Sequence, residues 1–255
     1  DRAPGTSGSS DKTPEAAAEV AAFFGTATVE DFVRQDDTVL YAGPDEWTYR
    51  RFILHYAHLC AVAGGVDAFC IGSEMRGLTQ IRSSADAYPA VEALCTLAAD
   101  VRSILGEQVK LGYAADWSEY FGHQPADGSG DVLFHLDPLW SSGDVDFIGI
   151  DNYMPLSDWR DGEGHVDASA GSIYDLEYLG ANVAGGEGFD WYYASADARE
   201  RQERLPIIDG AHGEHWVFRY KDLIGWWSKP HRNRVGGVRA AVPTTWRPKS
   251  KPIWF

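Results

Sequence analysis

Three largely apolar runs in this sequence each end in an acidic residue, and this repeat constrains the fold more than any other feature. Short apolar runs bounded by glycine or polar residues are typical of strands buried on both faces of a parallel sheet. Helical patterns separate the runs, and βα units bring the carboxyl ends of successive strands to one rim. The runs span residues 66–72, 109–115 and 145–150, and the acids are Glu74, Asp116 and Asp151.

Three helices are expected before and between these strands. Thr13 and Pro14 form a helix start, with threonine as the N-cap and proline in the first turn. The second helix opens at residues 43–45, and its apolar residues, Trp47, Phe52 and Tyr56 among them, recur at a period near 3.6. The helices are expected at residues 14–24, from 43–45 to Gly64, and at 88–105.

Glu74 is the first candidate for chemistry. A carboxylate without a partner at the end of a buried strand would be desolvated at a cost of several kcal/mol. Active sites of α/β folds lie at the carboxyl edge of the sheet, where loops open above the strands. The alternative interpretation is a structural carboxylate that pairs with Arg76 or Arg82.

The composition separates this chain from several classes of protein. Its 255 residues are 44% hydrophobic and 24% charged, which favours one large globular domain. A formal charge of −16 argues against nucleic-acid binding, which needs clustered lysine and arginine. The 10 Trp, 12 Tyr and 11 Phe are typical of proteins that stack sugar rings on aromatic faces, although large cores also use aromatic residues.

Cysteine, histidine and hydropathy patterns point to no disulfide framework, metal or membrane span. Cys60, Cys70 and Cys95 lie in apolar patterns and are expected to be buried free thiols, as in a reducing cytoplasm. The HGEHW segment at residues 212–216 lacks the helical spacing of a zinc protease, so we expect no catalytic metal and no cofactor. No apolar run approaches the roughly 18 residues of a membrane span.

Long segments of the chain resemble a known family. They are residues 41–82, residues 113–140, residues 146–162 and the terminal KPIWF. These segments are similar to the glycoside-hydrolase TIM-barrel-like domain of the host-contacting tail hub proteins of alphaproteobacterial gene transfer agents and related phages. The resemblance covers nearly the whole chain.

The resemblance implies a (β/α)8 barrel related to the retaining glycosidases. In such barrels an acid/base glutamate follows the fourth strand and a nucleophilic glutamate follows the seventh. KPIWF would be the seventh strand, so we expect the nucleophile beyond Phe255 and an incomplete barrel that also lacks its first strands. Residues 1–13 are expected to be loop or disordered, and 14–255 the barrel domain, with a long aromatic insertion at about 157–247.

The resemblance also implies roles for individual residues, through the motifs that this sequence shares with the family. Glu74 of IGSEM takes the acid/base position, and Ser73 stands where many of these glycosidases carry an asparagine that bonds the sugar 2-hydroxyl. The fifth and sixth strands would supply substrate contacts. Those contacts are Asp116, Trp117, Glu119, Asp151, Asn152 and Tyr153. Asp116, Glu119 or Asp151 could also stand opposite Glu74 as the second carboxylate.

Two functions fit these features. The first, which the resemblance implies, is a retaining glycoside hydrolase of a gene transfer agent or phage tail that acts on, or binds, a bacterial envelope polysaccharide during DNA delivery. The second is a catalytically inert structural or glycan-binding barrel of the tail hub. Both imply synthesis in the bacterial cytoplasm, assembly into a tail-like particle and contact with other tail or baseplate proteins.

We expect these 255 residues by themselves to hydrolyse glycosides very poorly. An acid catalyst alone contributes about 10² to 10⁴-fold and leaves the oxocarbenium-like transition state without an opposing carboxylate. The measurement is release of reducing ends from purified envelope glycans. Robust turnover that Glu74→Gln abolishes would instead place the second carboxylate among Asp116, Glu119 and Asp151.

Overall fold

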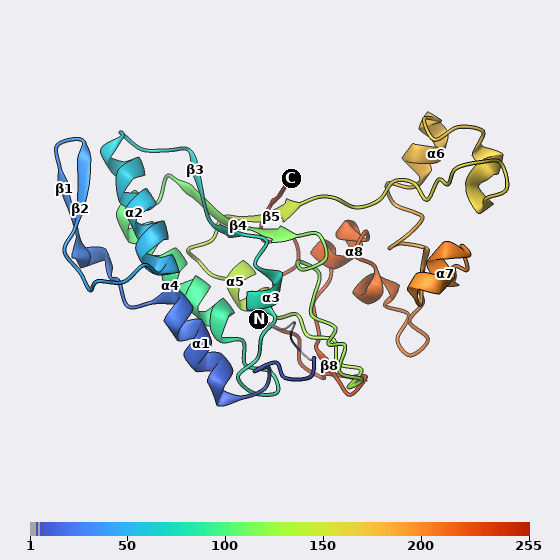
Figure 1. Cartoon of the computed structure of the whole chain (residues 1–255), viewed down its shortest axis with the longest axis horizontal. Helices are drawn as coiled ribbons and strands as arrows, with labels where there is room; N and C mark the ends of the chain where they lie inside the picture. Colours follow the sequence, from blue (N-terminus) through green and yellow to red (C-terminus); the bar gives the residue numbers. More distant parts are fainter. Residues whose placement is uncertain (1–3, 5) are drawn as a thin grey trace. The chain divides into compact units, whose positions relative to one another are not determined.

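The computed structural model describes residue 4 and residues 6–255, which form two compact units. The first unit comprises the chain up to Asp151 together with Pro230–Phe255, and the second comprises Asn152–Lys229. Figure 1 shows the elements of both units along the chain. No helix among the described residues is long and apolar enough to cross a membrane.

A parallel sheet is the centre of the first unit. Its strands are adjacent in the order β10-β5-β4-β3, so three strands that follow one another in the sequence lie side by side. This arrangement confirms the predicted mixed α/β architecture with a parallel sheet. In the described part of the chain the sheet has four strands, with β3 and β10 at its edges. The strands are β3 (Ala68–Ser73), β4 (Lys110–Asp116), β5 (Phe147–Asp151) and β10 (Ile253–Trp254).

Helices cover one face of this sheet. Helix α4 (Pro89–Leu105) packs against β3 and against α1 (Pro14–Phe24), α2 (Tyr49–Val62) and α5 (Asp137–Trp140), as Figure 1 shows. Alternate strand residues face these helices because successive side chains of a strand point to opposite sides. The helix-facing residues are buried and include Ile71, Leu111, Tyr113, Ile148 and Ile150.

Small residues and one aromatic stack shape the other face. Gly112 is the register partner of Phe147, and a Cβ atom on Gly112 would lie 2.3 Å from the Phe147 ring. The Phe147 ring in turn stacks on Trp254, with centroids 4.0 Å apart. The absence of a side chain at Gly112 therefore lets the Phe147 ring lie across β4.

Two expectations about burial are wrong. Strand β3 is not buried on both faces, because it is an edge strand, and only Ile71 in it is fully buried. For the same reason Cys70 is exposed, while Cys60 and Cys95 are half-buried; all three cysteines, which lie within the described residues, are free.

The second helix begins later than expected, at Tyr49. The preceding residues are held in a non-helical path because the Glu46 carboxylate accepts hydrogen bonds from the amides of Thr26 and Ala27 and from the Thr48 hydroxyl. Trp47 therefore precedes the helix and is 88% exposed. The antiparallel hairpin of β1 (Phe32–Gln35) and β2 (Thr38–Tyr41), which the sequence analysis does not predict, packs beside α2.

The start of the chain is anchored to a buried arginine. Residues 6–13 form turns and bends, and Asp11 accepts hydrogen bonds from the backbone and side chain of Arg82. Arg82 is fully buried and also pairs with Asp127. Residues 1–3 and 5 of the expected loop lie outside the described residues. Shorter elements of the first unit are η1 (Val29–Asp31), α3 (Arg76–Thr79), β8 (Arg234–Val235) and β9 (Val238–Arg239).

The second unit contains short elements held by polar contacts. Asp158 accepts hydrogen bonds from Tyr193, Gln202 and Arg204, and Arg204 also pairs with Asp167. The unit covers the first part of the expected insertion, whereas residues 230–247 belong to the first unit. Its elements are η2 (Val166–Ala170), α6 (Leu176–Ala181), β6 (Trp191–Tyr192), α7 (Ala196–Glu200), β7 (Leu205–Pro206), η3 (His215–Phe218) and α8 (Leu223–Ser228).

Replacing Gly112 by alanine should destabilise the first unit by about 1–3 kcal/mol, the usual cost of overpacking, because the new methyl group would displace the Phe147 ring. Urea unfolding measures the change. Gly143→Ala is the matched control, since a Cβ atom there would meet no atom within 4 Å. Equal stability of the two variants would contradict this account of the sheet.

Candidate functional site

The carboxyl ends of three strands form the candidate site. Asp116 at the end of β4 is the register partner of Asp151 at the end of β5. The hydroxyl of Ser73, the last residue of β3, donates a hydrogen bond to Asp151 Oδ2 at 2.8 Å. Side chains from β3 and β5 thus meet at the rim, next to the end of β4, as expected from parallel strands that each end in a polar residue.

Glu74 follows β3 in an unusual backbone conformation. Its φ angle is 51°, in the left-handed region that non-glycine residues rarely adopt and that costs on the order of 1–2 kcal/mol. The Glu74 amide donates to the carbonyl of Ala114 at 2.8 Å, and the amide of Met75 donates to the Tyr113 hydroxyl at 2.9 Å. These two bonds fix the conformation by tying the chain after β3 to β4.

The Glu74 side chain is exposed, and no ion pair within the described residues involves it. Arg82 is occupied by Asp11 and Asp127, and Arg76 donates to the Ser118 hydroxyl at 2.9 Å. The structural ion pair that was the alternative interpretation is therefore not formed. A strained, exposed carboxylate at the carboxyl edge of a sheet is a candidate functional group.

Asp116 is held by the residues that follow it. Its Oδ1 atom accepts a hydrogen bond from the Ser118 amide at 2.7 Å and another from the Ser118 hydroxyl. Because Arg76 donates to the same hydroxyl, Ser118 links α3 to the end of β4. Ser118 and Arg76 were not predicted as site residues. The sequence does contain one signal for Ser118, because an aspartate followed by a serine two positions later favours an Asx turn. Trp117, which lies between Asp116 and Ser118 in the sequence, is half-buried.

Glu119 lies beneath the rim and not on it. The side chain is fully buried and accepts hydrogen bonds from the Tyr113 hydroxyl at 2.9 Å, the Asp116 amide at 3.1 Å and the Thr79 hydroxyl. Burial raises the pKa of Glu119 to about 7, although these donors oppose the shift. Glu119 thus joins β4, α3 and the loop after β4, and it has no surface on which to contact a sugar.

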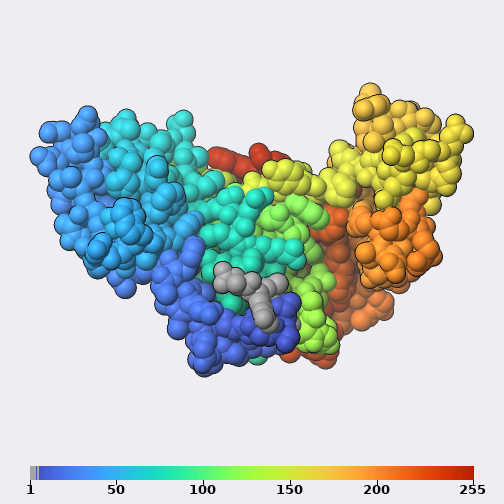
Figure 2. All heavy atoms as spheres, viewed as in Figure 1, coloured from blue at the N-terminus to red at the C-terminus, as the bar shows by residue number. Residues whose placement is uncertain are grey.

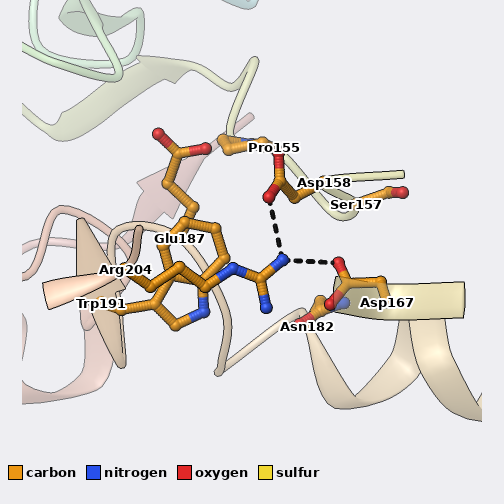
Figure 3. A pocket seen from close by; sticks show the side chains of 8 residues that line it. All are labelled: Pro155, Ser157, Asp158, Asp167, Asn182, Glu187, Trp191 and Arg204. Atoms are coloured by element: carbon orange, nitrogen blue, oxygen red, sulfur yellow. Dashed lines mark hydrogen bonds and ion pairs between the residues drawn. The ribbon is translucent and has the colours of Figure 1, made fainter. Parts of the chain in front are cut away.

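The remaining predicted residues begin the second unit. The side-chain oxygen of Asn152 accepts a hydrogen bond from the Met154 amide at 3.1 Å, and Tyr153 is 74% exposed. The second unit has its own small cavity of about 30 Å³, shown in Figure 3. Arg204 bridges Asp158 and Asp167 there, at 2.8 Å from each, and lies over the Trp191 ring. A cavity of this size holds about one water molecule, so the cluster is structural.

No group of three or more His, Cys, Asp or Glu side chains within residue 4 and residues 6–255 could hold a metal ion. The site contains an exposed carboxylate from Glu74, carboxylates from Asp116 and Asp151 that accept hydrogen bonds from serines, and a buried acid from Glu119 that holds the loops.

Comparison with known families gives one match. The family model of the GTA TIM-barrel-like domain, in which GTA denotes gene transfer agent, matches residues 47–255. The match includes the four parallel strands and the whole candidate site, and it confirms the expected family. Comparison with curated proteins gave no match.

Glu119→Gln should change how stability depends on pH. The pKa of Glu119 is raised from 4.5 to about 7 on folding, so its contribution is complete below about pH 4.5 and is lost as the pH rises through 7. Each pKa unit corresponds to about 1.4 kcal/mol, so the wild-type protein should lose on the order of 3 kcal/mol relative to the variant across this window.

Urea unfolding at about pH 5 and about pH 8 checks this expectation. Glu107→Gln, at an exposed position, controls for the loss of a surface charge. Parallel pH profiles for the wild-type protein and Glu119→Gln would contradict the burial of an ionisable Glu119.

Proposed function

The chain belongs to the GTA TIM-barrel-like domain family. From this premise we propose that it is a component of a gene transfer agent particle. In this proposal it contacts a bacterial envelope glycan at the carboxyl edge of β3, β4 and β5. In this proposal the four parallel strands are one wall of a (β/α)8 barrel. The observation that carries it is the exposed, left-handed Glu74 beside the Ser73–Asp151 hydrogen bond.

The rim chemistry suits a neutral sugar. Carboxylates accept hydrogen bonds from sugar hydroxyls, and Ser73 and Ser118 add groups that both donate and accept. Asp116 and Asp151 are oriented by those serines, so their remaining acceptor positions are fixed before a ligand arrives. Trp117, next to Asp116, is half-buried and adds an aromatic side chain to this edge.

In the catalytic form of the proposal Glu74 donates its proton to the glycosidic oxygen as the bond to the anomeric carbon breaks. A carboxylate opposite Glu74 attacks that carbon if the carboxyl groups stand about 5–5.5 Å apart, and activates a water if they stand about 6.5–9.5 Å apart. Asp116 and Asp151, which are half-buried at the ends of β4 and β5, are the acids proposed for this role.

A non-catalytic glycan-binding domain is the second candidate, and one observation favours it. Glu119, whose pKa of about 7 would suit proton donation near neutral pH, is enclosed by Thr79 and Tyr113 and cannot reach a substrate. Its role in the structure is to hold the loops. Under this second candidate, Glu74 contributes a hydrogen bond to the glycan and no proton transfer.

Binding to purified peptidoglycan, capsule and lipopolysaccharide glycans tests the proposal. Asp151→Asn and Ser73→Ala should each weaken binding about 5 to 150-fold, because a lost or misdirected hydrogen bond to a charged group costs about 1–3 kcal/mol. Glu163→Gln, at an exposed position of the second unit, should bind as the wild-type protein does. Glycan binding that none of the rim variants changes would overturn the assignment of the site.

A further inference from the structure

A groove of about 560 Å³ lies between the β1–β2 hairpin and the start of helix α2 in the first unit. One wall is formed by residues 39–41 of β2, and the other by Trp47, Thr48, Arg51, Phe52 and His55. Residues 48, 51, 52 and 55 recur at helical spacing, so they form a single stripe. In Figure 1 the hairpin, in blue, lies beside α2, in lighter blue, and Figure 2 shows the same part of the chain as spheres. The volume is within the usual range of ligand sites.

The walls of this groove are apolar and exposed. Trp47 is 88% exposed, Phe52 56% and Leu40 50%. Single exposed apolar side chains are ordinary, but a contiguous group around a groove marks an interaction surface. Trp47 and Phe52 belong to the periodic apolar pattern that predicts a buried helix face. They lie in this groove instead, and no other segment of the described chain covers them.

Arg51 gives the groove a fixed positive charge. Its guanidinium carbon lies 4.1 Å from the ring centroid of Tyr41 and 4.1 Å from that of Trp47, and one nitrogen donates to the Glu46 carbonyl. No carboxylate within the described residues pairs with it. Arg204 in the second unit, which also lies over a tryptophan, pairs with two aspartates. Arg51 is therefore an oriented cation with hydrogen-bond donors still available.

The acids near this groove are already occupied. Glu46 accepts from the Thr26 and Ala27 amides, and Asp31 accepts from the Thr28 amide. No acidic side chain lines the groove, although the chain has 38 acidic and 22 basic residues. Burial, together with the nearby Glu46, Asp31 and Asp45, raises the pKa of Tyr41, so the complementarity of the groove to a carboxylate comes from direct contact with Arg51.

We propose that this groove binds a polypeptide segment that packs apolar side chains against Trp47, Leu40 and Phe52 and presents a carboxylate to Arg51. Leu40, Trp47 and Phe52 offer exposed apolar surface to the side chains of a peptide, and the Thr48 hydroxyl already donates to Glu46. The site lies on the hairpin and α2, not on the strand ends, so it does not depend on the glycan site.

Selection of random heptapeptides displayed on phage, with the whole 255-residue protein as bait, tests the proposal. The enriched peptides should contain an acidic residue beside aliphatic or aromatic ones. Each is then synthesised with its acid and with the corresponding amide, and the dissociation constants are measured by calorimetry. The acid-to-amide change should weaken binding to the wild-type protein by about 10-fold or more.

Variants of the groove distinguish the contact between the peptide carboxylate and Arg51 from nonspecific hydrophobic binding. In Arg51→Gln the acid and amide peptides should bind equally, since the carboxylate has lost its partner. Trp47→Ala removes an exposed side chain, so the fold should persist while binding falls at least about 10-fold. Tyr174→Ala, at an 83% exposed position of the second unit, is the matched control and should bind as the wild-type protein does.

Other outcomes would overturn the proposal. These are enrichment of peptides without acids, no enrichment at all, or an acid-to-amide effect of the same size in Arg51→Gln. Trp47-dependent self-association in sedimentation experiments would assign the groove to a second copy of the chain. Displacement of bound peptide by an acidic oligosaccharide such as oligogalacturonate, with tighter binding than the peptide, would assign it to a glycan.

Discussion

The hydrogen bonds to the buried carboxylate of Glu119 hold the rim of this domain together. They come from the Thr79 hydroxyl at the end of α3, the Tyr113 hydroxyl within β4 and the amide of Asp116 where β4 ends. Tyr113 also accepts from the amide of Met75, so the chain that follows Glu74 is connected to this carboxylate. A buried acid without these donors would be strongly destabilising, and the loops therefore cannot separate independently.

The first unit presents two surfaces with opposite chemistry. At the strand ends, Glu74, Asp116 and Asp151 make an acidic edge with serine hydroxyls between them, which suits a neutral, hydroxyl-rich ligand. In the groove beside α2, Arg51 lies between two aromatic rings among aliphatic side chains, which suits an apolar segment with a carboxylate. In the two proposals the acidic edge binds the glycan and the groove binds the peptide segment.

The second unit illustrates how a small body can be stable with few buried apolar side chains. Arg204 is sandwiched by contacts to Trp191, Asp158 and Asp167, and Asp158 collects further donors from Tyr193 and Gln202. Such networks stabilise most when every member is paired, and here the buried Arg204 Nε atom has no hydrogen-bond partner among the described residues. Composition alone associates the aromatic residues of this insertion with sugar stacking. In the structure one of them, Trp191, instead packs against the guanidinium group of Arg204.

The sequence by itself determined the three parallel strands β3, β4 and β5 and the polar residues at their ends, because these depend on local apolar runs, glycine boundaries and the βα alternation. It also determined helix α1, whose capping residues are adjacent to it. Only the tertiary structure decided that β3 is an exposed edge, that α2 begins at Tyr49, that Glu119 is buried and that Arg51 lies between Tyr41 and Trp47. Those features depend on contacts between different elements. Glu119 accepts a hydrogen bond from Thr79, Glu46 accepts one from Thr26, and Arg51 packs on Tyr41 of β2. No periodicity within one element encodes such contacts, since burial and pairing are set by what the rest of the chain brings to each side chain.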